Sequence, residues 1–265
     1  MTTATVIVER NDRVATVTLN RPAARNALDF EMMDALVANL AALANDHSLR
    51  AIVLRGAGAH FMAGGDVRAF AEHIDEPPAR RDGHFGRAVE RLHAAIEELQ
   101  RMPHAVIARV QGSVAGFGLS LLCACDLAVA AEDAYFTSAY RNLGLTPDGG
   151  LTFALPRIVG LRKTLEILLL SERLDATEAL RLGLVNKVVA VDDLDCAVAT
   201  WAASLASCPP LALRNVKRLA RQSLDRTLSE QLHAEALSFA QCAASADFAE
   251  GVRAFIAKRK PRFDQ

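Results

Sequence analysis

The sequence has no excess of charge of either sign. Its 265 residues include 30 lysines and arginines against 31 aspartates and glutamates, which gives a formal net charge of −1 at pH 7. No nucleic acid or anionic membrane is therefore expected as the main partner, since either would call for a strongly basic surface. Hydrophobic residues make up 51% of the chain, a content that excludes intrinsic disorder. The length suits one large domain or two small ones.

Cysteines and long apolar runs are also scarce. Five cysteines, an odd number, favour reduced thiols in a cytoplasmic protein over a disulfide framework. Cys123 and Cys125 lack a second pair or a histidine cluster, so no metal site is predicted. The apolar run Val110–Cys125, which has no charged residue, has 16 residues and is too short for a membrane span. With no basic and apolar leader at the start, we expect a soluble, cytoplasmic protein.

Several common catalytic motifs are missing. Gly116-Phe117-Gly118 lacks the third glycine of a dinucleotide-binding fingerprint, and the chain has no phosphate-binding G-x-x-x-x-G-K-[ST] sequence. Neither Ser113 nor Ser120 lies in a G-x-S-x-G elbow, which disfavours an α/β-hydrolase. No H-E-x-x-H zinc motif is present either.

The hydrophobic pattern predicts strands that alternate with helices, followed by a helical tail. Alternating apolar residues predict a hairpin around Asn11-Asp12, and a stripe of apolar residues predicts a helix from Asp29 to Leu43. Further strands are predicted at 51–55, 105–110, 126–130 and 187–191, and further helices at 85–99, 119–124 and in three segments near the C-terminus. Residues 73–84, with Pro77-Pro78, are predicted to form a loose surface loop. The fold class is α/β with a C-terminal helical region.

Two segments each combine a buried strand, a glycine-rich turn and the start of a helix. Gly64-Gly65 follows the strand at 51–55, and the turn from Gly112 to Gly118 follows the strand at 105–110. Glycine lets another molecule approach the main chain, and free N–H groups at a helix start favour negative charge. Each turn alone is equally explained as an ordinary tight turn. If their N–H groups converge, they form an oxyanion hole.

Collinear blocks over nearly the whole chain resemble the crotonase (enoyl-CoA hydratase/isomerase) superfamily. The matching blocks are Val17–Leu28 with Asn20-Arg21-Pro22, Phe61–Val67, Gln111–Asp126, Gly144–Gly150, Ala179–Val185 and Gly251–Pro261. The resemblance implies a crotonase-like spiral of ββα turns over residues 1–200. It also implies a helical region over residues 201–265 that mediates homotrimers or dimers of trimers.

The resemblance further implies an acyl-CoA thioester as substrate, with coenzyme A as part of that substrate and no separate cofactor. The backbone N–H groups of Gly65 and Phe117 would hold the thioester oxygen. The positions implied to bind the coenzyme A part are Ala24, Arg25, Ala27, Ala63, Gly65 and Val67, with Phe255 and Lys258 supplied by a neighbouring subunit.

The acid/base group differs from that of the family's hydratases. Their two glutamates correspond here to Ser120 and Tyr140, which are not carboxylates and are expected to contact the substrate or, for Tyr140, to orient Asp148. Some isomerases of the family, including the phenylacetate-pathway ring isomerase type, place their catalytic acid at the position of Asp148. One carboxylate suffices for a 1,3-proton shift. An apolar wall of Phe117, Leu121 and Leu143 is expected to raise the pKa of this acid. Alternatively, Asp148 is a turn residue before Gly149-Gly150.

The predicted activity is that of an enoyl-CoA isomerase with Asp148 as acid and base. One alternative is an enoyl-CoA hydratase, a lyase acting on 2-enoyl-CoA, in which Asp148 takes part in the addition of water. Another is an enzyme similar to the aryl-CoA dehalogenases, whose aspartate attacks the ring and follows an aromatic residue by eight positions, as Asp148 follows Tyr140. The third alternative is a protein that binds acyl-CoA without catalysis. His60 and Asp66 are expected to be structural.

Overall fold

The chain opens with the predicted hairpin. A computed structural model describes residues 4–263, in which β1 (Val6–Asn11) pairs antiparallel with β2 (Val14–Leu19). The strands that follow join β2 in parallel: β3 (Ala51–Gly56), β4 (Ala105–Val110), β6 (Leu127–Ala131) and β9 (Lys187–Val189). They form a six-stranded sheet in the order β1-β2-β3-β4-β6-β9. The sequences of these parallel strands are nearly continuous apolar runs, because helices cover both faces of the sheet.

A second, smaller sheet lies beside the end of the first one. It contains β5 (Ser113–Ala115), β7 (Tyr135–Thr137) and β8 (Leu174–Asp175) in the order β5-β7-β8. The chain passes from β4 to β5 through Gly112 and then enters α4 (Phe117–Ala124). A side chain at Gly112 would place its Cβ 2.2 Å from the carbonyl oxygen of Ala59, so only glycine fits this corner. One strand in each sheet followed by a helix is the repeating unit of the core.

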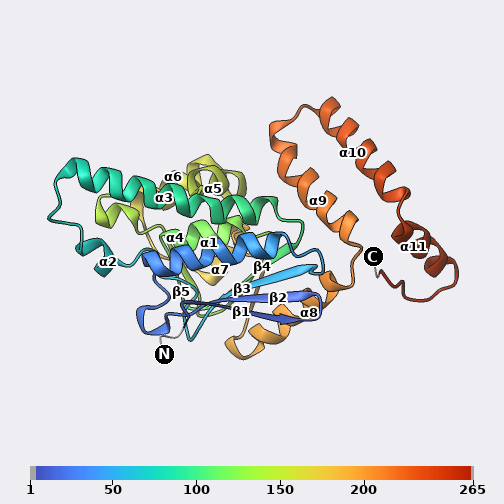
Figure 1. Cartoon of the computed structure of the whole chain (residues 1–265), viewed down its shortest axis with the longest axis horizontal. Helices are drawn as coiled ribbons and strands as arrows, with labels where there is room; N and C mark the ends of the chain where they lie inside the picture. Colours follow the sequence, from blue (N-terminus) through green and yellow to red (C-terminus); the bar gives the residue numbers. More distant parts are fainter. Residues whose placement is uncertain (1–3, 264–265) are drawn as a thin grey trace.

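Helices cover the two faces of the large sheet unequally. Helices α1 (Phe30–Ala44), α3 (Pro78–Arg101) and α4 pack on one face, and α8 (Leu194–Ala206) packs on the other (Figure 1). Alternate residues of one strand separate the two layers: Leu54 belongs to the first core and Val53 to the second. The predicted N-cap of α1 is confirmed, because the Asp29 carboxylate accepts a hydrogen bond from the N–H of Met32.

The remaining elements are short helices around the core. They are η1 (Pro22–Ala24), α2 (Val67–Ala71), η2 (Tyr140–Leu143), α5 (Leu151–Val159), α6 (Leu161–Leu170), α7 (Ala176–Arg181) and η3 (Val191–Asp193). Within residues 4–263, no single helix is long and apolar enough to cross a membrane. Only the segments Val191–Ala206 and Pro210–Asp225 taken together meet that test, and they are bent by 109°.

The prediction of a loose loop over residues 73–84 is wrong for its second half. Helix α3 begins at Pro78, seven residues before the predicted start at Phe85, so only a short connection separates it from α2. A proline is well suited to the first turn of a helix, where its missing N–H is not needed. His73 and His84 stack there with ring centroids 3.8 Å apart, and Phe30 and Phe85 meet both rings edge-on. These contacts give the segment its defined structure.

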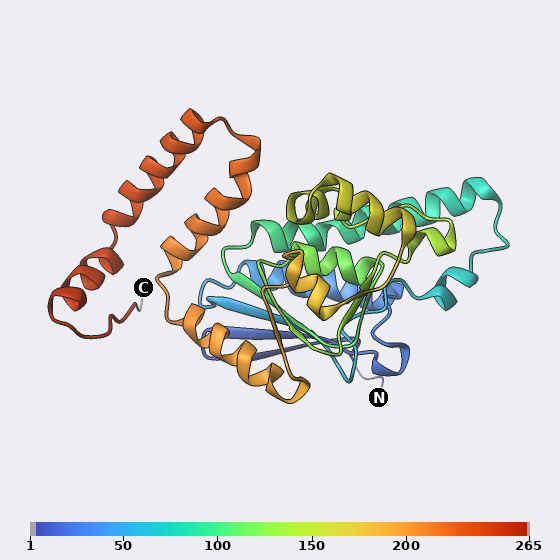
Figure 2. The same cartoon turned by 180° about the vertical axis from the view of Figure 1, so that it is seen from behind.

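The C-terminal region contains four helices rather than the three that were predicted. After α8 come α9 (Pro210–Gln222) with η4 (Ser223–Asp225), α10 (Leu228–Ala243) and α11 (Ala246–Ile256). Helices α9–α11, called the arm below, extend to one side of the core in both views (Figures 1 and 2). The predicted boundary at residue 200 falls inside α8, which packs on the sheet and belongs to the core.

One ion cluster fixes the arm to the core. Asp126, just before β6, accepts from Lys217 Nζ at 2.8 Å and from Arg221 Nη2 at 2.6 Å, both on α9. The other carboxylate contact of Asp126 is the N–H of Val106 at 2.8 Å, in β4. The carboxylate therefore joins a strand of the sheet to the first helix of the arm.

Candidate active site

The two glycine turns meet in the structure. The segment at Met62 runs parallel to β5: its N–H donates to the carbonyl oxygen of Ser113 at 3.0 Å, and its carbonyl oxygen accepts from the N–H of Ala115 at 2.9 Å. Two residues beyond the paired Met62 and Val114, Gly64 and Gly116 both have positive φ angles, +91° and +51°. A Cβ added to Gly116 would lie 3.4 Å from the Cα of Gly64. The two turns are therefore in contact through their backbones, and the convergence of their N–H groups stays a prediction.

Each turn contributes a backbone N–H group without a partner. Phe117 opens α4, and the N–H groups of a first helical turn have no acceptor inside the helix. Over the described residues 4–263, neither the N–H of Phe117 nor that of Gly65 donates to a protein acceptor. Gly65 and Phe117 each directly follow one of the two glycines that are in contact, Gly64 and Gly116. Two N–H groups without a protein partner therefore lie next to the junction of the turns, and an anionic oxygen needs such donors.

The first predicted binding block lies against the first glycine turn. The carbonyl oxygen of Arg25 accepts from the N–H of Ala63 at 3.0 Å, and the N–H of Leu28 donates to the carbonyl oxygen of Gly64 at 2.7 Å. The structure therefore brings together six predicted residues from two separate parts of the chain: Ala24, Arg25, Ala27, Ala63, Gly65 and Val67. Arg25 and Val67 are exposed, so their side chains are accessible to a ligand.

Two nearby polar residues have structural roles, as expected. Asp66 caps α2 by accepting from the N–H of Arg68 and forms an ion pair with Arg21 at 2.9 Å. His60 accepts a hydrogen bond from the N–H of Ser113 through Nδ1 at 3.1 Å. Both side chains support the two turns, and we assign no chemistry to them.

Three predicted site residues form one hydrogen-bonded cluster. The Tyr140 hydroxyl donates to Oδ1 of Asp148 at 2.5 Å. The Ser120 hydroxyl, on α4, lies 3.0 Å from the Tyr140 oxygen and 2.9 Å from the backbone oxygen of Asp148. Tyr140 is positioned by Ala139, which has a left-handed φ of 57° and donates its N–H to Ser171 Oγ at 2.9 Å. A left-handed alanine is strained and persists where the surrounding contacts fix it.

Burial controls the ionisation of this cluster. Removal from water raises the pKa of Asp148 above the ordinary carboxyl value of 3.8, while the Tyr140 hydrogen bond and nearby His93 act in the opposite direction. Burial, followed by the charge of Asp148, strongly raises the pKa of Tyr140. Tyr140 therefore stays protonated and acts as a donor, whereas Asp148 is a carboxyl group whose pKa is moved towards neutral pH, as predicted.

Of the predicted apolar wall around Asp148, Phe117 lies against the loop that carries this residue. Phe117 and Leu121 on α4 are buried, and a Cβ on Gly149 would lie 2.7 Å from the Phe117 ring. Leu143 does not fit this prediction, because the residue is 50% exposed. It ends η2, a short helix whose single buried residue is Tyr140.

His93 is a site residue that sequence reasoning missed. It lies on α3, and its Nε2 accepts from the N–H of Gly149 at 3.4 Å, directly after Asp148 in the chain. Its position beside the buried stripe that contains Leu92 was the available signal. That signal is weak, because only the fold shows which loop α3 faces.

Phe255 and Lys258 lie far from this site within one chain. Phe255 is 86% exposed on α11, and Lys258 follows the end of that helix. Figure 1 shows α11 and α2, which follows the first glycine turn, at opposite ends of the molecule. The prediction that a neighbouring subunit supplies them stays a prediction.

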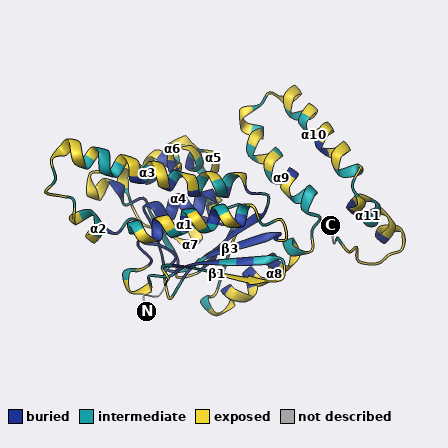
Figure 3. Cartoon of the chain, in the orientation of Figure 1, coloured by how far each residue is buried: buried dark blue, intermediate teal, exposed yellow. Residues whose placement is uncertain are grey.

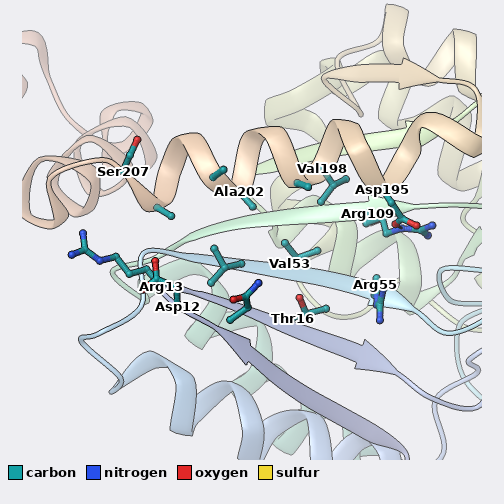
Figure 4. A pocket seen from close by; sticks show the side chains of 15 residues that line it. Asp12, Arg13, Thr16, Val53, Arg55, Arg109, Asp195, Val198, Ala202 and Ser207 are labelled. Atoms are coloured by element: carbon teal, nitrogen blue, oxygen red, sulfur yellow. Dashed lines mark hydrogen bonds and ion pairs between the residues drawn. The ribbon is translucent and has the colours of Figure 1, made fainter. Parts of the chain in front are cut away.

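A separate hollow of the surface lies away from these residues. It has a volume of about 870 Å³ and runs between α8 and the strands β2, β3 and β4, on the sheet face opposite to α1 and α3 (Figure 4). Arg109 crosses it to pair with Asp195 at 2.5 Å. None of the predicted site residues lines it. Within residues 4–263, no group of three or more histidine, cysteine or acidic side chains is arranged to hold a metal ion.

Comparison with known proteins identifies the family. Residues 9–265 match the sequence model of enoyl-CoA hydratase/isomerase. The chain belongs to this family. An enoyl-CoA hydratase from Polaromonas sp. JS666 has the same fold, with a TM-score of 0.91, 35% identity and coverage of 97% of this chain and 98% of that one. The core is therefore the crotonase spiral that the sequence predicted.

Relatives in the enoyl-CoA hydratase/isomerase family carry different activities. The chain is 34% identical to a crotonyl-CoA hydratase of Syntrophomonas wolfei, over 97% of both chains. It is 35% identical to the 1,2-epoxyphenylacetyl-CoA isomerase of Escherichia coli, over 94% of both. It is also 34% identical to a 4-chlorobenzoyl coenzyme A dehalogenase of Arthrobacter sp., over 96% of this chain and 91% of that one. The protein is an acyl-CoA enzyme of this family, and the reaction depends on its own side chains.

Proposed function

We propose that this protein is an enoyl-CoA isomerase that moves a double bond with Asp148 as its acid and base. The observation that carries the proposal is a partly buried carboxyl group with a raised pKa beside Phe117, whose free N–H lies at the junction of the two glycine turns. A carboxyl group tuned in this way exchanges protons with carbon more readily near neutral pH than an ordinary one.

The N–H groups of Gly65 and Phe117 would hold the thioester oxygen. Asp148 would take a proton from the carbon next to the carbonyl, and the electron pair of that C–H bond would move onto the oxygen as an enolate. The same carboxyl would then return the proton at the far end of the conjugated system, which shifts the double bond and restores the base. Loss of one such N–H donor typically costs about 10²–10³ in rate.

The side chains at the two hydratase glutamate positions support isomerisation. Ser120 and Tyr140 are hydrogen-bonded to each other and to Asp148. Neither is an acid that titrates near neutral pH. Addition of water needs a group that activates the water and a group that protonates carbon. A single carboxyl suits a proton shift better, because it performs both transfers in turn.

We also propose that the enzyme works as a homotrimer or a dimer of trimers, in the cytoplasm and without a cofactor of its own. The arm exposes large apolar side chains, among them Phe239 at 74% and Phe255 at 86%. A further copy would cover such a face. In that assembly Phe255 and Lys258 would reach the coenzyme A of a neighbouring subunit. Sedimentation tests the assembly: a stable monomer at micromolar concentration contradicts it, and Phe239→Lys is expected to weaken it.

Replacement of Asp148 tests the isomerase activity. Asp148→Asn keeps the shape of the residue and removes the base, so turnover of a 3-enoyl-CoA should fall at least ~10²-fold while binding of the thioester persists. Asp192→Asn, an exposed acid on η3, is the matched control. If Asp148→Asn isomerises within a few-fold of the parent rate, Asp148 is only a turn residue.

Product analysis separates the alternatives. A panel of 2-enoyl-, 3-enoyl- and aryl-CoA thioesters, followed by mass spectrometry and NMR, distinguishes a product with the mass of one added water from an isomer of unchanged mass. Water addition to a 2-enoyl-CoA without double-bond migration would make the enzyme a hydratase. Turnover of none of these thioesters, with binding intact, would leave an acyl-CoA binder.

A second candidate function is displacement of a halide from an aryl-CoA thioester. His93 favours it, because a histidine beside Asp148 could take the proton from a water that hydrolyses an ester formed on this carboxylate. The aspartate would bond to the ring carbon, the halide would leave, and water would release the hydroxylated ring. Halide release from 4-chlorobenzoyl-CoA, lost in both Asp148→Asn and His93→Ala, is the result that would support it over isomerisation.

A further inference from the structure

The buried hydroxyl of Tyr140 can donate one hydrogen bond, and the structure shows which atom accepts it. The O–H donates to Oδ1 of Asp148 at 2.5 Å, a short distance typical of a bond to a charged carboxylate. Burial keeps the phenol protonated, because it strongly raises the pKa of Tyr140. The residue is therefore a fixed donor aimed at one oxygen of the catalytic acid.

This hydrogen bond makes the two carboxyl oxygens of Asp148 inequivalent. Oδ1 is occupied by the Tyr140 hydroxyl, and no other side chain within residues 4–263 donates a hydrogen bond to this carboxyl group. Oδ2 is therefore the oxygen without a side-chain partner. A proton taken from the substrate would be added there, since Oδ1 already accepts a hydrogen along one of its lone pairs.

The hydrogen bond from Tyr140 also opposes the effect of burial on the pKa of Asp148. Desolvation raises the pKa of Asp148, and donation from Tyr140 lowers it. Without the hydroxyl, burial by Phe117 and its neighbours would continue to act while the compensating donor would be missing. A larger share of the carboxyl would then be protonated near neutral pH and unable to act as a base.

We propose that Tyr140 is a positioning residue that holds Oδ1 of Asp148 and leaves Oδ2 as the atom that takes and returns the proton. This inference rests on the proposed isomerase function and makes the expected orienting role of Tyr140 specific, because it assigns a different task to each oxygen of Asp148. Ser120 supports the arrangement from α4, since its hydroxyl lies within hydrogen-bond distance of both the Tyr140 oxygen and the Asp148 backbone oxygen.

The pH dependence of Tyr140→Phe tests the proposal. The acid limb of kcat for a 3-enoyl-CoA should move to higher pH, and turnover at pH 7 should fall about 10-fold with KM unchanged, because orientation of the base is lost. Part of the activity should return as the pH is raised. A purely structural role predicts an equal loss at every pH with no movement of the limb, and that result would overturn the inference.

A modification that is expected to move the acid limb in the opposite direction gives an independent test of the same proposal. The chain has two tyrosines, Tyr135 and Tyr140, so biosynthetic replacement with 3-fluorotyrosine in a Tyr135→Phe background modifies Tyr140 alone. The fluorinated phenol is a stronger donor, and the acid limb should move to lower pH. An unmoved limb contradicts the proposal. Unlabelled Tyr135→Phe is the matched reference.

Ser120→Ala and Asp148→Asn separate the possible failures. Ser120→Ala keeps the bond between Tyr140 and Asp148, so the acid limb should move less than in Tyr140→Phe; an equal movement would assign the effect to Ser120. If Asp148→Asn is fully active, the isomerase function itself is wrong. If Asp148→Asn is inactive while Tyr140→Phe keeps the parent pH profile, only the role of Tyr140 is wrong.

Discussion

The core and the arm of this protein differ in how far they bury their apolar side chains. In β3 and β4, nearly every residue is buried, and apolar side chains close both faces of the sheet within one chain (Figure 3). The described buried residues of α9 and α10 are Asn215 and Ser238, both polar, while Phe239 faces outwards. The core is therefore complete in a single chain, and the arm has an apolar surface that its own chain leaves uncovered.

The proposed catalytic groups and the two binding residues proposed to come from a neighbouring subunit lie in these different regions. Asp148, Tyr140 and both glycine turns belong to the core, where close packing fixes backbone N–H groups and one carboxyl group. Phe255 and Lys258 belong to the arm. We therefore expect changes in the core to alter turnover, and changes in the arm to alter assembly and affinity for coenzyme A.

The largest effect is expected from Gly64→Ala in the core. A Cβ at this position, with φ at +91°, would lie 3.0 Å from the carbonyl oxygen of Ala115 and push the two turns apart. Displacement of a donor should lower turnover about 10²–10³-fold. Gly183→Ala is the control, because Gly183 also has a positive φ but no atom within 4 Å of an added Cβ. Equal rates for the two variants would show that the contact between the turns is not needed for turnover.

Asp126→Asn tests the joint between core and arm. The change leaves Lys217 and Arg221 without their carboxylate and should cost about 3 kcal/mol in the free energy of unfolding, measured by chemical denaturation. Asp34→Asn removes an exposed pair with Arg91 and should cost less than about 1 kcal/mol. Similar losses in both variants would mean that the arm is held by other contacts.

The stability of Asp148→Asn should depend on pH. In the folded state the pKa of Asp148 is raised, so its carboxyl favours folding when protonated and opposes it once charged. Asn should therefore raise the melting temperature at pH 7, and the gain should vanish as the pH falls below the ordinary value of 3.8. Thermal melts at both pH values measure this. A gain that does not change with pH would show that burial does not destabilise the carboxylate.

The smallest effect is expected from Lys258→Ala in the arm. Loss of one exposed cation near a phosphate should raise KM for the thioester a few-fold, more at low salt, with kcat unchanged. Lys260→Ala, two residues further on, is the matched control. A change in kcat would place the arm in the chemistry and contradict the division between the two regions.

Local patterns predicted the elements whose signals lie close together in the sequence. The hairpin around Asn11-Asp12 and the helix capped by Asp29 are examples, since alternation, helical periodicity and capping all act within a few residues. The start of α3 was wrong because Pro77-Pro78 fits either a loop or the first turn of a helix. The aromatic contacts that order this segment come from residues distant in sequence, such as Phe30.

The sequence by itself determined the six strands of the large sheet and the two glycine turns, because each is set by residues near one another in the chain, and its resemblance to the family pointed to Asp148 as the candidate acid. Only the tertiary structure decided that the turns meet at Gly64 and Gly116, that Tyr140 donates to Asp148, and that His93 lies beside them. It also left the arm's apolar face uncovered. These features depend on how separate elements pack, and packing follows from the shape of the whole core rather than from a local pattern.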